Sequence, residues 1–466
     1  MQGKYDIVFL GGGPAGYQGA IRAAQLGAKV AVVEEQQVGG VCLNRGCIPT
    51  KTVRASVEVG RLIRRAREYG FRAVEVSPDI AAIVTRKNRI VKGLRTSVER
   101  LFSANKIDLI PGRGVLLNPC GIEVKGAEGS QLIEAAKVVI ATGSNPETLP
   151  IFPESPHIFT ADAILDIGYL PKHLLVVGGG AIGVEMAAIF RELGSHVTLV
   201  EAEASLLPSE DAEMVAYLMN VLKRRKINVR CNVTVESVGE TIEGFIIRLT
   251  DGTDLVSDTI IQAVGRRLNT DGIGLEGLGV ETSEGRIIVN ENLETNVAGI
   301  YAAGDVIGGW LLAHVAFFEG ICAAENALGK TKKIDYRVVP RCIFSLPEYA
   351  AVGISEEEAR PKNSVRVGRF PFKSLGMAQA MGEMEGLVKI IMDTRTDRIL
   401  GAHIIGPHAS DMIAETALAM RADLPSSMIE DTIHAHPTLS EAVLEVAQAL
   451  HGRAIHIPEQ VEGAFL

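Results

Sequence analysis

Two stretches of the chain repeat one order of apolar and glycine-rich segments. Each opens on a short apolar run of strand length, at residues 6–10 in the first stretch and 174–177 in the second. A glycine-rich turn follows, then a helix-compatible segment, and then a β-branched run at residues 29–33 or 196–200. The pattern predicts a strand, a tight turn, a helix and a second strand in each stretch, which indicates an α/β fold.

The two stretches also match glycine for glycine. Both contain the motif G-x-G-x-x-G, and both carry a glutamate 23 residues after the first glycine. Every matched position is separated by 167 residues. The matched pairs are Gly11 and Gly178, Gly13 and Gly180, Gly16 and Gly183, Gly27 and Gly194, and Glu34 and Glu201.

Each glycine of this motif has a physical role when the motif lies between a strand and a helix. The first glycine permits the tight turn, the second lets the backbone approach a pyrophosphate, and the third lets the helix pack closely on the strand. The helix then offers free N–H groups and a positive dipole end to the phosphates. The glutamate can accept hydrogen bonds from a ribose diol. Tight turns without a ligand would not need the two acids, so the repeat predicts two dinucleotide sites.

The residues after the second glutamate favour one nucleotide over another. Between Glu201 and Lys223 the chain contains no Lys or Arg. A 2′-phosphate would be repelled by Glu201 and would find no local cation, so we expect NAD rather than NADP at the second site. The first site lies beside a pair of cysteines, which indicates a flavin.

The pair, Cys42 and Cys47, stands in the segment GGVCLNRGCIPTKT. Five residues of regular helix rise about 7.5 Å, whereas a disulfide needs Cα atoms within about 6.8 Å. We therefore expect an irregular backbone between the two cysteines, for which Gly46 and Pro49 are suitable. A short, constrained bridge is easily reduced. If a helix begins near Cys47, the ammonium of Lys51 lies on its face and favours a thiolate.

Two other interpretations of the pair exist. A zinc site would need a second pair of ligands, which the sequence lacks, so we expect no metal. Two unrelated buried thiols stay possible on spacing alone. The other cysteines are isolated, and we expect them to be inert; they are Cys120, Cys231, Cys322 and Cys342.

Length and charge narrow the class of protein. The 466 residues predict about three domains, and the formal net charge of −9 disfavours a general nucleic-acid or anionic-membrane binder. No apolar stretch approaches the roughly 18 residues of a membrane span. The first residues lack the pattern of a secretory signal. We expect a cytoplasmic protein, or one of an organelle matrix if a transit peptide was removed.

The cysteine segment, following a G-x-G-x-x-G unit and its acid, resembles the redox-disulfide motif of the pyridine nucleotide–disulfide oxidoreductases. VVIATGS at 138–144 resembles that family's junction after the flavin domain, and GIYAAGDV at 299–306 resembles its second FAD motif. The resemblance covers nearly the whole chain. It implies that Cys42 and Cys47 form a redox disulfide and that Asp305, otherwise a plain turn residue, binds the ribityl chain of FAD.

The resemblance also assigns the other cofactor residues. Glu185 would pair with Lys51 near the flavin, although a carboxylate in a first helical turn can also serve the helix dipole alone. The FAD residues would be Gly11, Gly13, Gly16, Glu34, Lys51, Gly143 and Asp305. The NAD residues would be Gly178, Gly180, Gly183, Glu185, Glu201 and Gly265.

The segment IHAHPTLSEA near the end of the chain supplies a candidate base. Glu441 lies five residues after His436 and can accept a hydrogen bond from its ring. Taken alone, a structural pair is the commoner interpretation. The resemblance instead implies that His436 is the base that handles the dithiol and acts on the disulfide of the partner subunit, oriented by Glu441, with a cis bond before Pro437. We expect His434 either to support the reacting groups from behind or to stabilise the fold, and we do not expect His314 to act as a base.

Within the family, the chain resembles the members that oxidise dihydrolipoamide. GAHIIGPHASDMIAETALAM and HAHPTLSEA carry this likeness, and the tail VEGAFL lacks the cysteines of some other branches. Val41, Arg45 and Thr50 depart from the common motif, and Arg45 adds a charge that bears on the potential or the thiol preference. The resemblance implies a homodimeric FAD enzyme that reduces NAD. Its partner would be dihydrolipoamide or a lipoyl domain of a 2-oxoacid dehydrogenase or glycine-cleavage type complex.

Two other functions and a domain plan complete the expectations. The chain could be another NAD(P)H-dependent flavin disulfide or quinone/oxygen reductase, or a non-enzymatic flavoprotein scaffold that binds a multienzyme core. We expect two Rossmann-like domains and a C-terminal α+β dimerisation domain. Their expected bounds are 1–150 for FAD, 151–271 for NAD, 272–340 for a segment completing the FAD site, and 341–466 for dimerisation.

Overall fold

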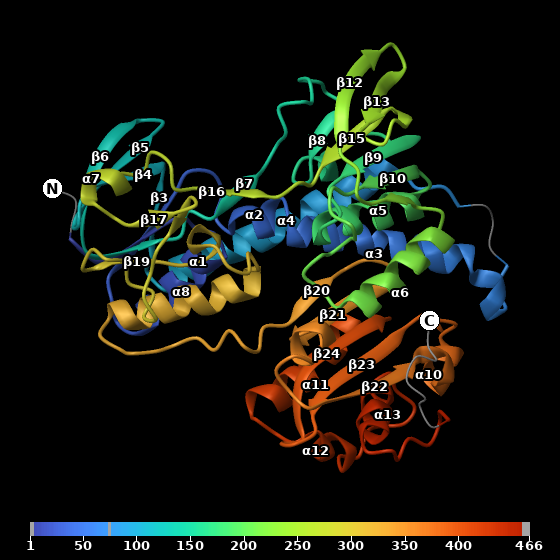
Figure 1. Cartoon of the computed structure of the whole chain (residues 1–466). Helices are drawn as coiled ribbons and strands as arrows, with labels where there is room; N and C mark the ends of the chain where they lie inside the picture. The colour runs from blue at the N-terminus through green and yellow to red at the C-terminus, as the bar shows by residue number, and fades with distance from the viewer. Residues whose placement is uncertain (1–3, 73–75, 459–466) are drawn as a thin grey trace. The chain divides into compact units, whose positions relative to one another are not determined.

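The computed structural model describes residues 4–72 and 76–458 (Figure 1). The tail VEGAFL lies outside these residues. The chain forms two compact units, each built from three segments. Unit 1 contains the residues up to Thr148, Thr160–Tyr169 and Gly265–Asp335, and unit 2 contains Leu149–Phe159, Leu170–Val264 and the residues from Tyr336 onward.

One long strand joins the two halves of the sheet in unit 1. β6 (Gly129–Ile140) runs parallel to β1 (Tyr5–Leu10) in its second half and antiparallel to β5 (Gly121–Gly126) in its first half. The order is β3-β2-β1-β6-β5-β4, with β19 beside β6. β1 and β6 therefore end at the same edge, where dinucleotides bind in such sheets. The other strands are β2 (Val30–Glu34), β3 (Asp108–Pro111), β4 (Arg113–Asn118) and β19 (Ile300–Ala302).

Two helices of unit 1 pack through glycines. α1 (Pro14–Gln25) begins directly after the first glycine turn and packs against α8 (Ala313–Ala327). A Cβ on Gly320 would lie 2.0 Å from the carbonyl oxygen of Ala15, so only glycine permits this approach. The remaining elements of unit 1 are α2 (Gly40–Asn44), α3 (Cys47–Arg64), η1 (Ala66–Tyr69), α4 (Ile80–Ala104), β7 (Ser144–Pro146), η2 (Ile164–Asp166), β16 (Arg266–Leu268), α7 (Leu275–Leu278), β17 (Thr282–Ser283), β18 (Arg286–Ile287) and η3 (Asp305–Ile307).

Unit 2 contains a second parallel sheet around the second glycine turn. β9 (His173–Val177) is followed by α5 (Ala181–Leu193) and then by β10 (His196–Val200), which pairs parallel to β9. The sheet order is β11-β10-β9-β15-β8. An antiparallel meander packs on it through Phe245 and Ile247. The other elements are β8 (Ile158–Thr160), α6 (Ala212–Arg224), β11 (Asn228–Arg230), β12 (Val235–Thr241), β13 (Gly244–Leu249), β14 (Asp254–Ser257) and β15 (Thr259–Gln262).

The end of the chain forms an antiparallel sheet covered by helices. Its order is β20-β21-β24-β23-β22, and its apolar core includes Ile404 from β24, Ile413 from α11 and Val443 from α13. The strands are β20 (Arg341–Ile343), β21 (Glu348–Gly353), β22 (Val365–Pro371), β23 (Leu387–Asp393) and β24 (Arg398–Gly406). The short helices and long helices are α9 (Glu356–Ala359), η4 (Phe372–Ser374), α10 (Gly376–Ala380), α11 (Ala409–Arg421), α12 (Ser426–Glu430) and α13 (Glu441–Leu450).

The expected fold class is confirmed: two α/β sheets, each with parallel strands around a glycine turn, are followed by an α+β segment. Among the helices of the described residues, none has both the length and the apolar composition that crossing a bilayer requires.

Candidate functional site

The first glycine turn connects the end of β1 to the start of α1. Gly11 has a φ of 105°, and a Cβ there would lie 2.2 Å from the carbonyl oxygen of Ala141. A Cβ on Gly16 would lie 1.8 Å from the carbonyl oxygen of Gly11. Gly13 differs, because the nearest neighbouring heavy atom to a Cβ there would be 3.8 Å away. The first and third glycines are thus required by the protein's own packing, whereas the second leaves space.

The second turn, between β9 and α5, repeats this geometry. A Cβ on Gly178 would lie 2.2 Å from the carbonyl oxygen of Ala263, and one on Gly183 would lie 1.8 Å from the carbonyl oxygen of Gly178. A Cβ on Gly180 would meet no neighbouring heavy atom within 4 Å. In both turns the open space lies directly before a helix N-terminus, where a pyrophosphate would bind.

The two glutamates are held in the same way. Oε2 of Glu34 accepts a hydrogen bond from the N–H of Gly12 at 2.7 Å, and Oε1 accepts one from the N–H of Gln36 at 2.7 Å. Glu201 accepts the equivalent bonds, from the N–H of Gly179 at 2.5 Å and from the N–H two residues further on at 2.8 Å. These bonds fix each carboxylate beside its turn and leave acceptor capacity for ribose hydroxyls. Both sites therefore fit a dinucleotide, FAD in unit 1 and NAD in unit 2.

Asp305 begins η3 and is held by a short polar chain. Its Oδ2 accepts a hydrogen bond from the hydroxyl of Ser144 at 2.5 Å. The Ser144 hydroxyl in turn accepts one from Nε of Arg266 at 2.7 Å. Sequence reasoning missed Ser144 and Arg266, because bonds between residues 122 positions apart leave no local pattern.

Two further predicted cofactor glycines lie in open positions. Gly143 has a φ of 71° and Gly265 one of 136°, and a Cβ on either would meet no neighbouring heavy atom within 4 Å. Gly265, which we expected with the NAD residues, begins the segment that belongs to unit 1. Its carbonyl oxygen accepts a hydrogen bond from the N–H of Glu147 at 2.9 Å.

Glu185 is a buried carboxylate in α5. Its Oε1 accepts a hydrogen bond from the backbone N–H of Phe344 at 2.8 Å, just after β20. Lys51 lies in α3 of unit 1. The pairing of Lys51 with Glu185 stays a prediction, because the two residues belong to different units.

The two cysteines lie on either side of a break between helices. Cys42 lies within α2, and Cys47 is the first residue of α3. Between them Arg45 has a φ of −138°, and Gly46 has a φ of −113° with a ψ of −105°. The predicted irregular backbone is confirmed. Pro49 lies in the first turn of α3, where its missing N–H is not needed.

The side chains of Cys42 and Cys47 are in hydrogen-bonding contact across this break. This hydrogen bond is the main cause that raises the pKa of the Cys42 thiol, and burial adds to it. The ammonium of Lys51 and the backbone N–H of Cys47 oppose the rise. Cys47 occupies the positive end of the 18-residue α3, which favours a negative charge there.

Arg45, the unusual residue between the cysteines, is directed to neighbouring polar groups. Its Nη1 donates a hydrogen bond to Oε1 of Gln36 at 2.6 Å. Its charge also acts on Asp162: burial raises the pKa of this carboxyl, while Arg266 and then Arg45 oppose the rise. The extra charge is thus engaged by the loop after β2 and by Asp162.

The predicted pair near the chain's end is formed. Nδ1 of His436 lies 2.8 Å from Oε1 of Glu441, and Oε2 accepts a hydrogen bond from the N–H of Thr438 at 2.8 Å. The pKa of Glu441 is lowered: burial raises it, but the Thr438 N–H and His436 outweigh burial. The bond between His436 and Pro437 is cis. The imidazole is 78% exposed in this chain.

His434 lies in a different environment. Its side chain is only 6% exposed, and Nε2 lies 2.8 Å from Oε1 of Glu415. Nδ1 lies 2.9 Å from the carbonyl oxygen of Thr432. Both ring nitrogens are therefore engaged, as a structural histidine requires. His314, the second residue of α8, belongs to unit 1. In the described part of the chain, no three His, Cys, Asp or Glu side chains form a group that could hold a metal ion.

Comparison with known proteins accounts for most of the chain. The family model described as pyridine nucleotide-disulphide oxidoreductase matches residues 5–320. The model of that family's dimerisation domain matches residues 339–447.

Individual relatives agree with these matches. The dihydrolipoyl dehydrogenase of Bacillus subtilis is 40% identical over 98% of this chain and 100% of its own length. The solved structure of LpdA from Mycobacterium tuberculosis has a TM-score of 0.90 at 31% identity, covering 95% of this chain and 99% of that one. The HOCl-induced flavoprotein disulfide reductase RclA from Escherichia coli has a TM-score of 0.87 at 30% identity, with coverage of 95% and 99%. The chain therefore belongs to the pyridine nucleotide–disulphide oxidoreductase family.

Proposed function

We propose that this protein is an FAD-dependent dehydrogenase that oxidises dihydrolipoamide to lipoamide and reduces NAD. The observation that carries the proposal is the contact between Cys42 and Cys47 at the start of α3, in the unit that holds the first dinucleotide turn. The B. subtilis relative, named dihydrolipoyl dehydrogenase, supports the choice of substrate.

The dithiol step uses residues of two subunits. The partner subunit's His436, oriented by its own Glu441, takes the proton from one substrate thiol. The resulting thiolate attacks the sulfur of Cys42 in the oxidised pair, and the sulfur–sulfur bond breaks with Cys47 leaving as thiolate. The second substrate thiol then closes the lipoyl ring and releases Cys42 as a thiol. One disulfide and one dithiol are consumed, and one of each is formed.

The remaining electron transfer depends on the cofactors that the two turns fit. When bound, the flavin supplies the two-electron chemistry that connects the dithiol to the nicotinamide. Cys47, at the positive end of α3, holds the negative charge on the flavin side. Glu201 binds the NAD ribose and excludes a 2′-phosphate. We keep the pairing of Lys51 with Glu185 as part of this proposal.

We also propose how the subunits assemble and how each chain divides into domains. The dimerisation-domain match and the exposed imidazole of His436 support a homodimer in which each histidine serves the other subunit. We propose three domains: an FAD domain of residues 1–150 with 272–340, an NAD domain of 151–271 and a dimerisation domain of 341–466. We also propose a location in the cytoplasm or an organelle matrix and a lipoyl domain as the physiological partner.

A second candidate function is reduction of another disulfide or acceptor. It is favoured by the likeness to RclA, a flavoprotein disulfide reductase, and by Arg45, which departs from the common motif. The two functions differ in the preferred thiol and in direction.

Anaerobic titration of the purified holoenzyme tests the proposal. Dihydrolipoamide in stoichiometric amounts should produce the long-wavelength charge-transfer absorbance of the Cys47 thiolate beside the flavin, and NAD should abolish it with formation of NADH. Dithiothreitol and glutathione serve as comparison thiols and should react at least about tenfold more slowly. No change in the flavin spectrum with dihydrolipoamide, together with rapid reduction by NADH and transfer to another acceptor, would favour the second function.

A further inference from the structure

A basic row crosses the C-terminal sheet. Each member is the direct cross-strand partner of the next, from β20 through β21, β24 and β23 to β22. Direct partners on adjacent strands project to the same face, so one face presents four cationic or imidazole side chains. The row consists of Arg341, Ala351, His403, Lys389 and Arg369.

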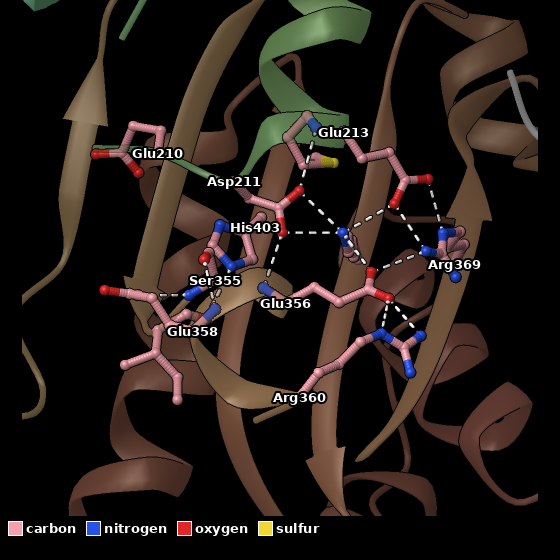
Figure 2. Close-up of polar contacts among 12 residues, drawn as sticks. Glu210, Asp211, Glu213, Ser355, Glu356, Glu358, Arg360, Arg369 and His403 are labelled. Carbon is pink, nitrogen blue, oxygen red and sulfur yellow. Dashed lines mark hydrogen bonds and ion pairs between the residues drawn. The ribbon is translucent and has the colours of Figure 1, made fainter. Parts of the chain in front are cut away.

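The acidic start of α6 binds to this row at its centre. Nζ of Lys389 lies 2.9 Å from both carboxylate oxygens of Asp211, and both side chains are fully buried. The same Nζ lies 2.8 Å from Oε2 of Glu213 and 2.8 Å from Oε2 of Glu356. Figure 2 shows the three carboxylates converging, with Arg369 beside Glu213 and Glu356. A buried ammonium with three carboxylates allows little freedom of position.

The residue before Asp211 binds to the end of the row. Arg341 donates two hydrogen bonds to Glu210, from Nε to Oε1 at 2.8 Å and from Nη2 to Oε2 at 3.0 Å. The hydroxyl of Tyr349 donates a third to Oε2 at 3.0 Å. This planar, bidentate contact fixes direction as well as distance.

These contacts hold the loop before α6, and this loop packs against the second dinucleotide turn. It runs from Glu201, which binds the N–H of Gly179, to Asp211. Within it the N–H of Leu207 donates to the carbonyl oxygen of Gly179 at 3.1 Å. Leu206 is fully buried, and its Cδ2 would lie 2.4 Å from a Cβ on Gly179. The loop therefore packs against the turn at one end, and its other end forms hydrogen bonds and ion pairs with the C-terminal sheet.

The helix after the turn, α5, is hydrogen-bonded to the residue that follows β20. Glu185 in α5 accepts the N–H of Phe344, three residues after Arg341. One end of the C-terminal sheet thus contacts the NAD-side turn from two directions, through α5 and through the loop that carries Glu201.

We propose that Arg341 and Lys389 are positioning residues for NAD: through Glu210 and Asp211 they hold the loop that fixes the second glycine turn and Glu201. The proposal rests on the assignment of NAD to that turn. None of these residues belongs to unit 1, which holds Cys42, Cys47 and the flavin-side turn. Loss of the contacts should therefore weaken NAD binding without slowing reduction of the flavin by the dithiol.

The chain supplies a matched control at the other end of the same helix. Glu385 forms ion pairs with Arg224 at 3.0 Å and with Arg225 at 2.9 Å, at the C-terminal end of α6. This contact joins the same two segments of unit 2 but does not touch the loop after Glu201. Glu385→Gln should remove comparable ion pairs without moving the NAD site.

The experiment compares Arg341→Gln, Tyr349→Phe and Glu385→Gln as holoenzymes. NAD binding is measured by calorimetry, without thiol, and flavin reduction by dihydrolipoamide is followed anaerobically in a stopped-flow instrument. Arg341→Gln should raise the Kd and KM for NAD by about fivefold or more, the lower range of coupling between distinct sites. Its flavin-reduction rate should stay within about twofold of the parent, and its saturating turnover should fall less than its KM rises. Tyr349→Phe should shift in the same direction by a smaller factor, and Glu385→Gln should change neither quantity.

Three results would overturn the proposal. They are an unchanged NAD Kd in Arg341→Gln, an equal loss of NAD affinity in Glu385→Gln, and parallel losses of NAD binding and flavin reduction. If Arg341→Gln does not fold, Tyr349→Phe decides, because it removes one hydroxyl and little volume. A parent enzyme that binds NAD but is not reduced by dihydrolipoamide would refute the proposed substrate while leaving this comparison of NAD affinities intact.

Discussion

Nδ1 of His436 lies 2.8 Å from the carboxylate of Glu441, yet the imidazole is 78% exposed in this chain. The nearby pair of His434 and Glu415 has the same distance, but His434 is buried and bonded at both ring nitrogens. The contrast separates a histidine that is bonded at both ring nitrogens within the fold from one whose imidazole is largely exposed in this chain.

This contrast gives the first prediction. His436→Gln should lower the rate of dihydrolipoamide oxidation by about 10²- to 10⁴-fold, the usual contribution of a positioned base. Transfer from NADH to an artificial acceptor should be unaffected, because that reaction does not need the thiol proton. Steady-state rates in both assays check this. His434→Gln is the control and should lower the melting temperature more than it lowers turnover; the reverse ranking would reassign the two histidines.

The pH dependence of the pair follows from Glu441. Its pKa is lowered, chiefly because the Thr438 N–H and His436 outweigh the effect of burial. A carboxyl with a depressed folded pKa contributes stability above its unfolded pKa of about 4.3, and this is lost as the pH falls through the folded value. Glu441 should thus stay ionised throughout the range above pH 5. Glu441→Gln should lower thiol turnover at every pH in that range, and an effect confined to acid pH would contradict the assignment.

A second prediction separates the two cysteines. Cys47→Ser should abolish the long-wavelength charge-transfer absorbance on reduction by the dithiol, because its sulfur holds the charge beside the flavin. Cys42→Ser should retain a charge-transfer band, since Cys47 still carries the thiolate. Each variant should lose dithiol turnover by several orders of magnitude, as loss of a reacting group does. Anaerobic spectra distinguish them, and a band that survives in Cys47→Ser would exchange the two roles.

A third prediction uses the open second glycine of each turn. Gly13→Ala and Gly180→Ala place a methyl group where the nearest neighbouring atoms are 3.8 Å away or beyond 4 Å, at φ values of −70° and −71°. Neither change should strain the backbone, so melting temperatures of the apoprotein should stay within a few degrees. Gly13→Ala should lose bound FAD, and Gly180→Ala should keep FAD but bind NAD at least about tenfold more weakly.

The matched control is Gly183→Ala, whose Cβ would lie 1.8 Å from the carbonyl oxygen of Gly178. This variant should be destabilised before any ligand is considered. If Gly180→Ala proved as unstable as Gly183→Ala, the space before α5 would have a packing role instead of a phosphate-binding one.

Much of the fold and of the candidate site could be predicted from local sequence patterns. The glycine turns, the interruption between Cys42 and Cys47, and the pair of His436 with Glu441 depend on residues close in sequence, where spacing constrains geometry. The family resemblance extended these to both cofactors and to the fold.

The contacts that sequence reasoning missed are long-range. Asp211 and Lys389 are 178 residues apart, and Ser144 and Arg266 are 122 apart. From sequence alone, an acidic run such as Glu210–Asp211 indicates the solvent-exposed start of a helix. Its true partners become apparent only when the register of a distant sheet is known. Such pairs leave no periodicity, because they arise only when segments far apart in the sequence come together in the fold.

The last prediction concerns the stability contributed by Lys389. The pKa of this buried ammonium is raised: burial lowers it, but Asp211 and the neighbouring carboxylates outweigh burial, while the pKa of Asp211 itself is lowered. Lys389 therefore stabilises the folded state fully below its unfolded pKa of about 10.4, and this stabilisation is lost as the pH rises through the higher folded pKa. The carboxylate contribution is present above about 3.9 and is lost as the pH falls through the lower folded value. Both stabilising contributions are fully present at pH 7.

Lys389→Met should thus reduce the free energy of unfolding at pH 7 by about 3–5 kcal/mol, because three carboxylates lose their shared cation. The deficit should shrink as the pH is lowered from 7 to 4, since protonation relieves the repulsion among the three carboxylates. Urea midpoints over this range measure it. Lys333→Met, which removes an exposed pair with Glu291, should cost less than about 1 kcal/mol at any pH. A deficit in Lys389→Met that is equally small, or that does not change with pH, would show that the buried cluster is not held by charge.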